Sequence, residues 1–141
     1  MSTILKKSAD INWQKIGDFI DIDDADLPGV KELKDAKASI IFDFAETERF
    51  GAVFEKWPAV KFDWHYECDE MFYILSGGPI IVTCEGEVME GGAGDAFFFT
   101  RGTNLTFDIK SELTGLTVHY PGFATILGRY KEYAKQLKEK S

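Results

Sequence analysis

Histidine, cysteine and basic residues are scarce in this 141-residue chain, and each scarcity argues against a class of function. The two cysteines, Cys68 and Cys84, lack Cys-x-x-Cys spacing, so we expect a reduced pair in a cytosolic protein. Acidic residues outnumber basic ones by 24 to 16, and no basic stripe for nucleic acid is present. No apolar run approaches the roughly 18 residues of a membrane helix, and no signal peptide opens the chain. We therefore expect a cytoplasmic protein that binds neither nucleic acid nor membranes.

The chain does contain a series of short strands. From Ala38 onward, apolar and polar residues alternate, β-branched and aromatic side chains are frequent, and glycine or proline marks the turns. The pattern predicts strands at 39–44, 50–56, 60–65, 70–75, 80–84, 87–89, 95–99, 105–109 and 116–120. No helical segment separates them, which excludes a parallel sheet of alternating strands and helices. We expect one all-β domain, a jelly roll or small barrel.

The two ends of the chain differ from this middle part. Residues 1–37 are predicted to form an irregular arm, residues 38–121 the barrel, and residues 122–141 an amphipathic helix with apolar residues at three-and-four spacing. Trp13, Ile16, Phe19 and Ile22 are spaced to dock the arm onto a sheet or a neighbouring subunit. Because the arm has no obvious core of its own, we expect a homodimer.

Titratable and aromatic side chains concentrate in the block from Trp64 to Gly77. Polar groups inside a small barrel are costly unless they are paired or bind a ligand, so we expect a small-molecule pocket there. Glu70 is the leading catalytic candidate, because burial among aromatics would raise its pKa and suit it to proton transfer. His65 could ligate a metal or act as a general base, and Tyr66 could donate a hydrogen bond or a proton.

Other residues could bind the substrate. Trp64, Phe72 and Phe97 are candidates for the pocket wall, although only part of the Phe97–Phe99 run can face one side of a strand. Glu67 is a second carboxylate that could equally lie on the rim. Arg101, at a turn, could clamp a carboxylate substrate or could be an ordinary surface arginine.

His119 lies on the last predicted strand and has two possible orientations. If Thr117 and His119 face inward, His119 could meet His65 across the barrel as a metal ligand. If Leu116, Val118 and Tyr120 face inward instead, His119 is a solvent or interface residue. The hydrophobic alternation favours the second orientation.

Two motifs in this block resemble those of the cupin superfamily. Its first motif ends in Glu, six residues and Gly, as from Glu70 to Gly77, and its second opens on Gly-Asp and closes on Gly, as from Gly94-Asp95 to Gly102. This resemblance covers about residues 38–120 and implies a double-stranded jelly-roll barrel. Within the superfamily, the chain is most similar to the EutQ-like (ethanolamine utilisation) cupins, on Trp64, Asp69-Glu70, Gly94-Asp95 and Tyr120-Pro121.

The chain departs from the metal-binding cupins at their histidine positions. Depending on spacing, these fall on Asp63 and His65 or on Trp64 and Tyr66, and the second-motif histidine falls on Leu105. The resemblance therefore leaves two outcomes open. Either a divalent transition metal (Zn, Mn, Ni or Fe) is held by His65, Glu70 and His119, or there is no metal.

Three functions are compatible with these features. The first is an enzyme of lyase, isomerase or hydrolase type that acts on a small organic acid or amine by acid/base or weakly metal-assisted chemistry. The second is a non-catalytic binding or accessory protein related to EutQ, and the third a purely structural dimer-forming barrel. We favour the enzyme, and we expect Glu70 to line a common cavity with at least one of Trp64, His65 and Tyr66.

Overall fold

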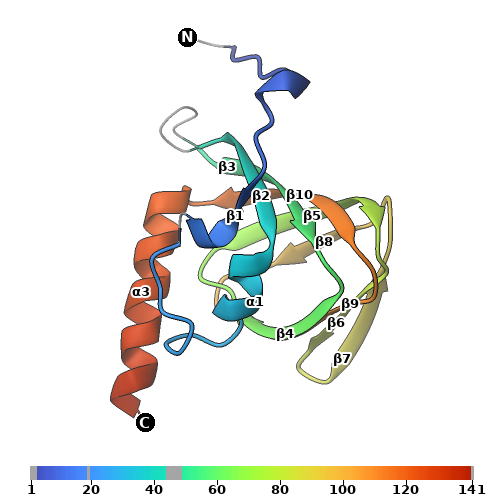
Figure 1. Ribbon diagram of the computed structural model, residues 1–141. Helices are drawn as coiled ribbons and strands as arrows, with labels where there is room; N and C mark the ends of the chain where they lie inside the picture. Colours follow the sequence, from blue (N-terminus) through green and yellow to red (C-terminus); the bar gives the residue numbers. More distant parts are fainter. Residues whose placement is uncertain (1–2, 19, 44–48, 141) are drawn as a thin grey trace.

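The computed structural model describes residues 3–18, 20–43 and 49–140 and shows two antiparallel β-sheets. The larger sheet has the strand order β1-β2-β3-β10-β5-β8 and the smaller one the order β4-β9-β6-β7 (Figure 1). The strands are β1 (Gln14–Lys15), β2 (Lys37–Phe42), β3 (Gly51–Trp57), β4 (Val60–His65), β5 (Asp69–Gly77), β6 (Ile80–Cys84), β7 (Glu87–Gly91), β8 (Ala96–Phe99), β9 (Asn104–Ile109) and β10 (Leu113–Tyr120). The predicted all-β fold is confirmed, and every predicted strand has a counterpart. Phe44, at the end of the first, lies outside the described residues.

The core lies between the two sheets because each strand turns alternate side chains inward. On β4, Phe62 and Trp64 are buried, and on β5, Phe72 and Ile74 are buried, with exposed or half-buried residues between them. Trp57 of the larger sheet stacks on Phe62 of the smaller one, with ring centroids 5.0 Å apart. Aromatic contacts of this kind join the two sheets across the barrel.

Gly77 ends β5 in a conformation that favours glycine. Its φ is +82°, and a Cβ atom at this position would collide with the backbone carbonyl of Glu112. The glycine that closes the first motif is therefore required by the turn into β6.

The N-terminal arm is more ordered than the sequence predicts. It contains two short 3₁₀ helices, η1 (Ser8–Asp10) and η2 (Ile16–Asp18), and the helix α1 (Val30–Asp35). Ile16 and Ile22 are buried in the same core cluster as the barrel residues, so the predicted docking of the arm onto a sheet is confirmed for these two. Phe19 lies outside the described residues. The arm thus has a place in the protein's own core.

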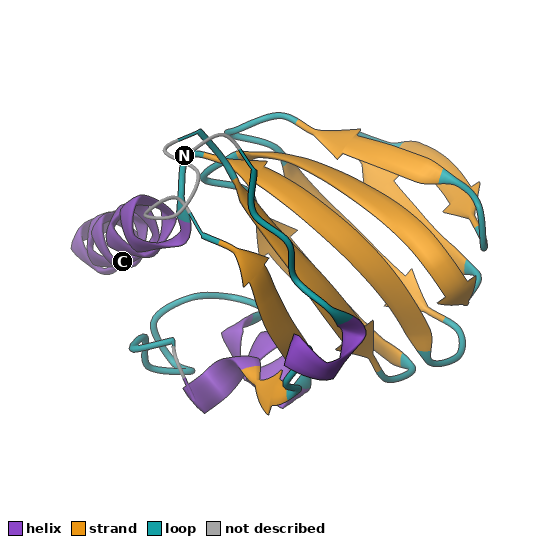
Figure 2. Cartoon of the chain, turned by 90° about the horizontal axis from the view of Figure 1, so that it is seen from above, coloured by secondary structure: helices purple, strands orange, loops and turns teal. Residues whose placement is uncertain are grey.

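The predicted C-terminal helix is α3 (Phe123–Lys140), and it lies alongside the barrel, next to the arm (Figures 1 and 2). Its buried side chains are Ile126, Tyr130 and Ala134. Lys138 Nζ lies 2.7 Å from Asp26 Oδ1, which ties the last turns of α3 to the arm. No helix in the described part of the chain is both long and apolar enough to cross a membrane.

Candidate functional site

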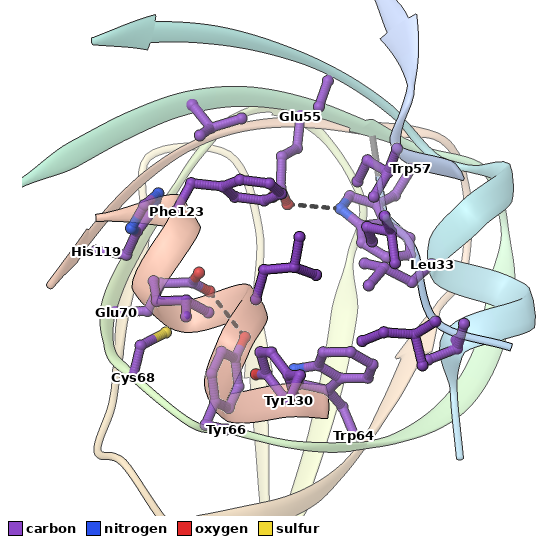
Figure 3. Close-up of a pocket in the computed structure, with 18 of the residues that line it drawn as sticks. Leu33, Glu55, Trp57, Trp64, Tyr66, Cys68, Glu70, His119, Phe123 and Tyr130 are labelled. Atoms are coloured by element: carbon purple, nitrogen blue, oxygen red, sulfur yellow. Dashed lines mark hydrogen bonds between the residues drawn. The ribbon is translucent and has the colours of Figure 1, made fainter. Parts of the chain in front are cut away.

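A cavity of about 120 Å³ lies inside the barrel (Figure 3). Both sheets contribute to its wall, and the arm and α3 add apolar side chains such as Leu33 and Phe123. Its polar lining residues come from four strands or their ends, and they are Glu55, Trp57, Trp64, Tyr66, Cys68, Glu70 and His119, joined by Tyr130 from α3. The expected common cavity of Glu70 with Trp64 and Tyr66 is confirmed.

Glu70 is held by Tyr66 at the wall of this cavity. Glu70 is in phase with the inward Phe72 of β5, and Tyr66 follows β4 in phase with the inward Trp64. The Tyr66 hydroxyl donates a hydrogen bond of 2.8 Å to Glu70 Oε2. Burial, followed by repulsion from Glu55, raises the pKa of Glu70 from 4.5 to about 8, although the hydrogen bond from Tyr66 opposes the rise. Glu70 is thus suited to hold a proton near neutral pH.

Glu55 is the second carboxylate in the cavity, and the sequence reasoning missed it. On β3 it alternates with Val53 and Trp57, both of which are buried. Trp57 Nε1–H donates a hydrogen bond of 2.8 Å to Glu55 Oε2, and burial raises the pKa of this carboxyl from 4.5 to about 7. The signal was available, because a glutamate between two inward-facing apolar positions of a strand must itself face inward.

His119 faces inward, so the orientation that the hydrophobic alternation favoured is wrong. Thr117 and His119 are buried, whereas Tyr120 is exposed. The His119 ring packs against Gly51 of β3, where a Cβ atom would collide with it. His119 Nδ1 lies 2.9 Å from the Pro121 carbonyl oxygen, and burial lowers the pKa of the imidazole. His119 is therefore a neutral histidine of the cavity wall.

His65 lies on the opposite face of β4 from Trp64 and is not among the residues that line the cavity. Its two ring nitrogens lie 2.9 Å from Asn104 Oδ1 and 3.0 Å from Glu67 Oε1. The ring also stacks on Tyr133 of α3, with centroids 3.9 Å apart. His65 therefore joins α3 to the outside of the barrel and does not meet His119 across it.

The three aromatic residues that were predicted to bind the substrate lie in three different places. Trp64 lines the main cavity, and Phe72 lines a smaller cavity of about 30 Å³ that shares Glu55 and Glu70 with it. Phe97 stacks on Phe99 within the β8 strand, away from both cavities.

Glu67 and Arg101 form a separate pair outside both cavities. The Arg101 Nε–H donates a hydrogen bond of 3.2 Å to Glu67 Oε2, and the Arg101 side chain is exposed. The two residues are brought together with His65 and not with Glu70.

The residues do not fit the usual cupin metal site. Because Trp64 and Tyr66 face inward, they occupy the histidine positions of the first motif, and His65 points away. The described ranges contain no group of three His, Cys, Asp or Glu side chains placed to hold a metal ion. The predicted ligand set of His65, Glu70 and His119 is therefore not assembled. Adjacent residues of a strand face opposite sides, so His65 points away from the cavity that Trp64, Glu70 and His119 line.

Comparison with known proteins finds relatives of this chain. The family model described as "Ethanolamine utilisation protein EutQ" matches residues 12–124. A curated relative, "Acetate kinase EutQ" of Clostridioides difficile (strain 630), is 24% identical over 81 residues, which are 57% of this chain and 51% of the relative. The chain thus spans about half the length of that relative.

Solved structures agree with the family match. A putative ethanolamine utilisation protein Q of Salmonella typhimurium LT2 has a TM-score of 0.57 at 26% identity, covering 62% of this chain and 71% of the other. The Clostridium difficile EutQ protein has a TM-score of 0.60 at 19% identity, covering 80% and 88%. The cupin domain of Schizosaccharomyces pombe Cnp3 has a TM-score of 0.51 at 21% identity, covering 68% and 71%. The predicted cupin jelly roll is confirmed.

Proposed function

Since the chain belongs to the EutQ family and has the cupin fold, we propose that its barrel cavity binds a small organic molecule and that Glu70 exchanges a proton with it. The observation that supports this proposal best is the Tyr66–Glu70 hydrogen bond at the wall of a cavity that also contains Glu55. Two carboxylates and a phenol that face one enclosed space resemble the acid/base groups of many active sites.

The pKa of Glu70 supports a role in proton transfer. A general acid or base works best when its pKa lies near the operating pH, and burial raises the pKa of Glu70 to about 8. Tyr66 orients the carboxyl group, because its hydroxyl donates a hydrogen bond to Glu70 Oε2. Glu55, whose pKa rises to about 7, can take up a proton that Glu70 releases. The reaction class is a proton-transfer reaction of lyase, isomerase or hydrolase type.

The size of the cavity limits the ligand. An apolar cavity of about 150 Å³ accommodates a benzene molecule, so a cavity slightly smaller than this suits a molecule of about four to six non-hydrogen atoms. A ligand in the cavity would lie against apolar side chains of the arm and of α3. A non-catalytic EutQ-like binding protein would use the same pocket without turnover.

The test compares the wild-type protein with Glu70→Gln, which keeps an acceptor for the Tyr66 hydroxyl. NMR spectra would be recorded with a panel of small amines, alcohols and carboxylic acids, and each binder would then be followed for turnover. We expect at least one panel member to perturb signals of Trp64 and Tyr66. An enzyme should lose turnover in the variant and retain its fold, whereas a binding protein shows no turnover in either form. A panel in which nothing binds inside the barrel would refute the proposal.

Acetate kinase activity is a second candidate, because the curated relative carries that name. Acetate and phosphate are anions that basic side chains would hold, and none of the described residues lining the cavity is lysine or arginine. We therefore expect little acetyl phosphate when the protein is incubated with acetate and MgATP. Robust formation that survives Glu70→Gln would place this activity outside the barrel.

A further inference from the structure

When Glu55 and Glu70 are ionised, the open hydrogen-bonding atoms of the cavity are mainly acceptors. The indole N–H of Trp57 and the hydroxyl of Tyr66 are already donated to Glu55 Oε2 and Glu70 Oε2. No hydrogen bond within the described residues reaches the second oxygen of either carboxylate. Among the described residues, no fully buried side-chain nitrogen or oxygen lacks a hydrogen-bond partner. Since these two oxygens have no partner, neither is fully buried, and both are accessible from the cavity.

His119 adds a third acceptor. A carbonyl oxygen can only accept, so the contact with Pro121 places the proton on Nδ1 of His119 and leaves a lone pair on Nε2. The side chain is buried, with 6% of its surface exposed, and it lines the cavity. No hydrogen bond from the described part of the chain reaches Nε2.

Aromatic side chains share the apolar part of the wall with aliphatic ones such as Val30, Leu33 and Ile126. Trp57, Trp64, Phe123 and Tyr130 surround the same space as the two carboxylates (Figure 3). Phe62 lines the cavity as well. The faces of aromatic rings attract cations, and indole does so best. Acceptors and aromatic faces without a basic side chain are the complement of a positively charged group that carries N–H donors.

We propose that the cavity recognises a small organic ammonium ion, whose N–H groups donate to Glu55, Glu70 and His119 while its carbon atoms contact the aromatic wall. This inference rests on the proposed function, since it names the ligand class of the same site. At pH 8, above the pKa of about 7 of Glu55, a carboxylate ligand would be repelled by the ionised Glu55. A neutral alcohol offers one O–H donor, so it would leave most of the acceptors unpaired.

Binding of a cation is expected to release protons. Burial raises the pKa of Glu55 to about 7 and that of Glu70 to about 8, so the empty cavity holds protons near neutral pH. A bound ammonium ion favours the charged carboxylates and displaces those protons. The affinity should therefore increase between pH 6 and pH 8.

The other titratable groups that face the pair do not change charge in this range. Burial raises the pKa values of Tyr66, Cys68 and Tyr130 above their ordinary values, and it lowers the pKa of His119. All four side chains are therefore neutral between pH 7 and pH 8, and the release of protons reports on the two glutamates.

The test uses three probes of similar size and different charge: propylamine, propan-1-ol and propionate. Isothermal titration of the full chain at pH 8 should show propylammonium binding at least about tenfold more tightly than propan-1-ol, as expected for hydrogen bonds to charged groups, and no binding of propionate. Repeating the titration in buffers of different ionisation enthalpy should show proton release at pH 7. Glu55→Gln and Glu70→Gln should each weaken propylammonium binding at least about tenfold, while Glu67→Gln, outside the cavity, should leave it unchanged.

The outcomes separate the two proposals. If propan-1-ol or propionate binds as well as propylammonium, the ligand site stands and the ammonium inference is wrong. If none of the probes binds, the ammonium inference is wrong, and the proposed function is then decided by the larger panel. Since the comparison of probes uses the wild-type protein, it remains decisive even if a variant fails to fold.

Discussion

Replacing Glu70 by Gln should stabilise the folded protein, and the gain should grow with pH. Glutamine keeps the shape of the side chain and an oxygen that accepts the Tyr66 hydrogen bond, but it cannot ionise. In the folded wild type, Glu70 binds its proton more tightly than in the unfolded chain, because burial and Glu55 raise its pKa. The folded state therefore binds more protons, and the free energy of unfolding falls as the pH rises from about 4.5 to about 8.

The size of this effect follows from the pKa values. Each pKa unit corresponds to about 1.4 kcal/mol, so a rise from 4.5 to about 8 corresponds to about 5 kcal/mol above pH 8. At pH 7 the expected gain is about 3 kcal/mol, and near pH 4.5 it is close to zero. A gain of about 3 kcal/mol is large beside the 5–15 kcal/mol stability of a typical domain and should raise the Tm by about 6–15 °C.

Urea unfolding followed by tryptophan fluorescence at pH 5, 7 and 9 would measure the gain. Glu87→Gln, at an exposed position of β7, is the matched control and should change the stability by less than about 0.5 kcal/mol at each pH. A variant that is less stable than the wild type at pH 9 would refute the reasoning, because Glu70 would then be an ionised and stabilised carboxylate. A gain that does not depend on pH would refute it as well.

Three further predictions concern different parts of the molecule. Tyr66→Phe removes the hydrogen bond that lowers the pKa of Glu70, so NMR titration should place the Glu70 pKa above its wild-type value, and an unchanged or lower pKa would contradict the assigned contact. His65→Ala should leave the metal content unchanged in elemental analysis by mass spectrometry, because His65 lies outside the cavity, whereas loss of a stoichiometric transition metal in this variant would show that His65 is a ligand. Light scattering at micromolar concentration should show a dimer that Phe98→Glu disrupts, since Phe98 is 67% exposed beside Met71 on the outer face of β8 and β5, and a monomeric wild type would contradict this prediction.

Strands and the last helix could be predicted because their periodicity is local. The strands 60–65 and 80–84 coincide with β4 and β6, and the predicted apolar face of the C-terminal segment matches the buried side chains of α3. The arm could not be predicted in the same way. The helix α1 has only six residues, and Val30 is held by the barrel core rather than by a helical pattern of its own. Short helices of this kind depend on tertiary contacts, which a sequence pattern does not display.

The apolar residues of the arm explain why the expected dimer needs different support. The prediction assumed that Ile16 and Ile22 lack a core, but both pack into the core of their own chain. Among the exposed apolar residues, Met71 and Phe98 occupy paired positions on β5 and β8. The dimer therefore remains a prediction, and its expected contact has moved from the arm to the sheet.

Some of the predicted site residues line the cavity and others do not, because the alternation of side chains along a strand was applied to some residues only. The motif identified Glu70, and the inward positions of Trp64 and Tyr66 follow from the buried Phe62 two residues earlier. His65 cannot share their face, so the spacing that places histidines at Asp63 and His65 was excluded by the same alternation. His119 was misplaced because Leu116 and Val118, although apolar, lie on the outer face of the larger sheet.

The alternation of side chains along the strands also explains why two carboxyl groups lie inside the barrel. In a cupin that binds a metal, the cation compensates the motif glutamate; here Trp64 and Tyr66 take the histidine positions, and Glu55 adds a second carboxylate. Two buried carboxylates without a cation must hold protons or attract a positively charged partner. The raised pKa values of Glu55 and Glu70 mean that the empty cavity holds protons. A bound ammonium ion would be the positively charged partner that replaces them. The same two glutamates thus link the pH dependence of stability to ligand choice, so a variant that removes one carboxyl group should change both.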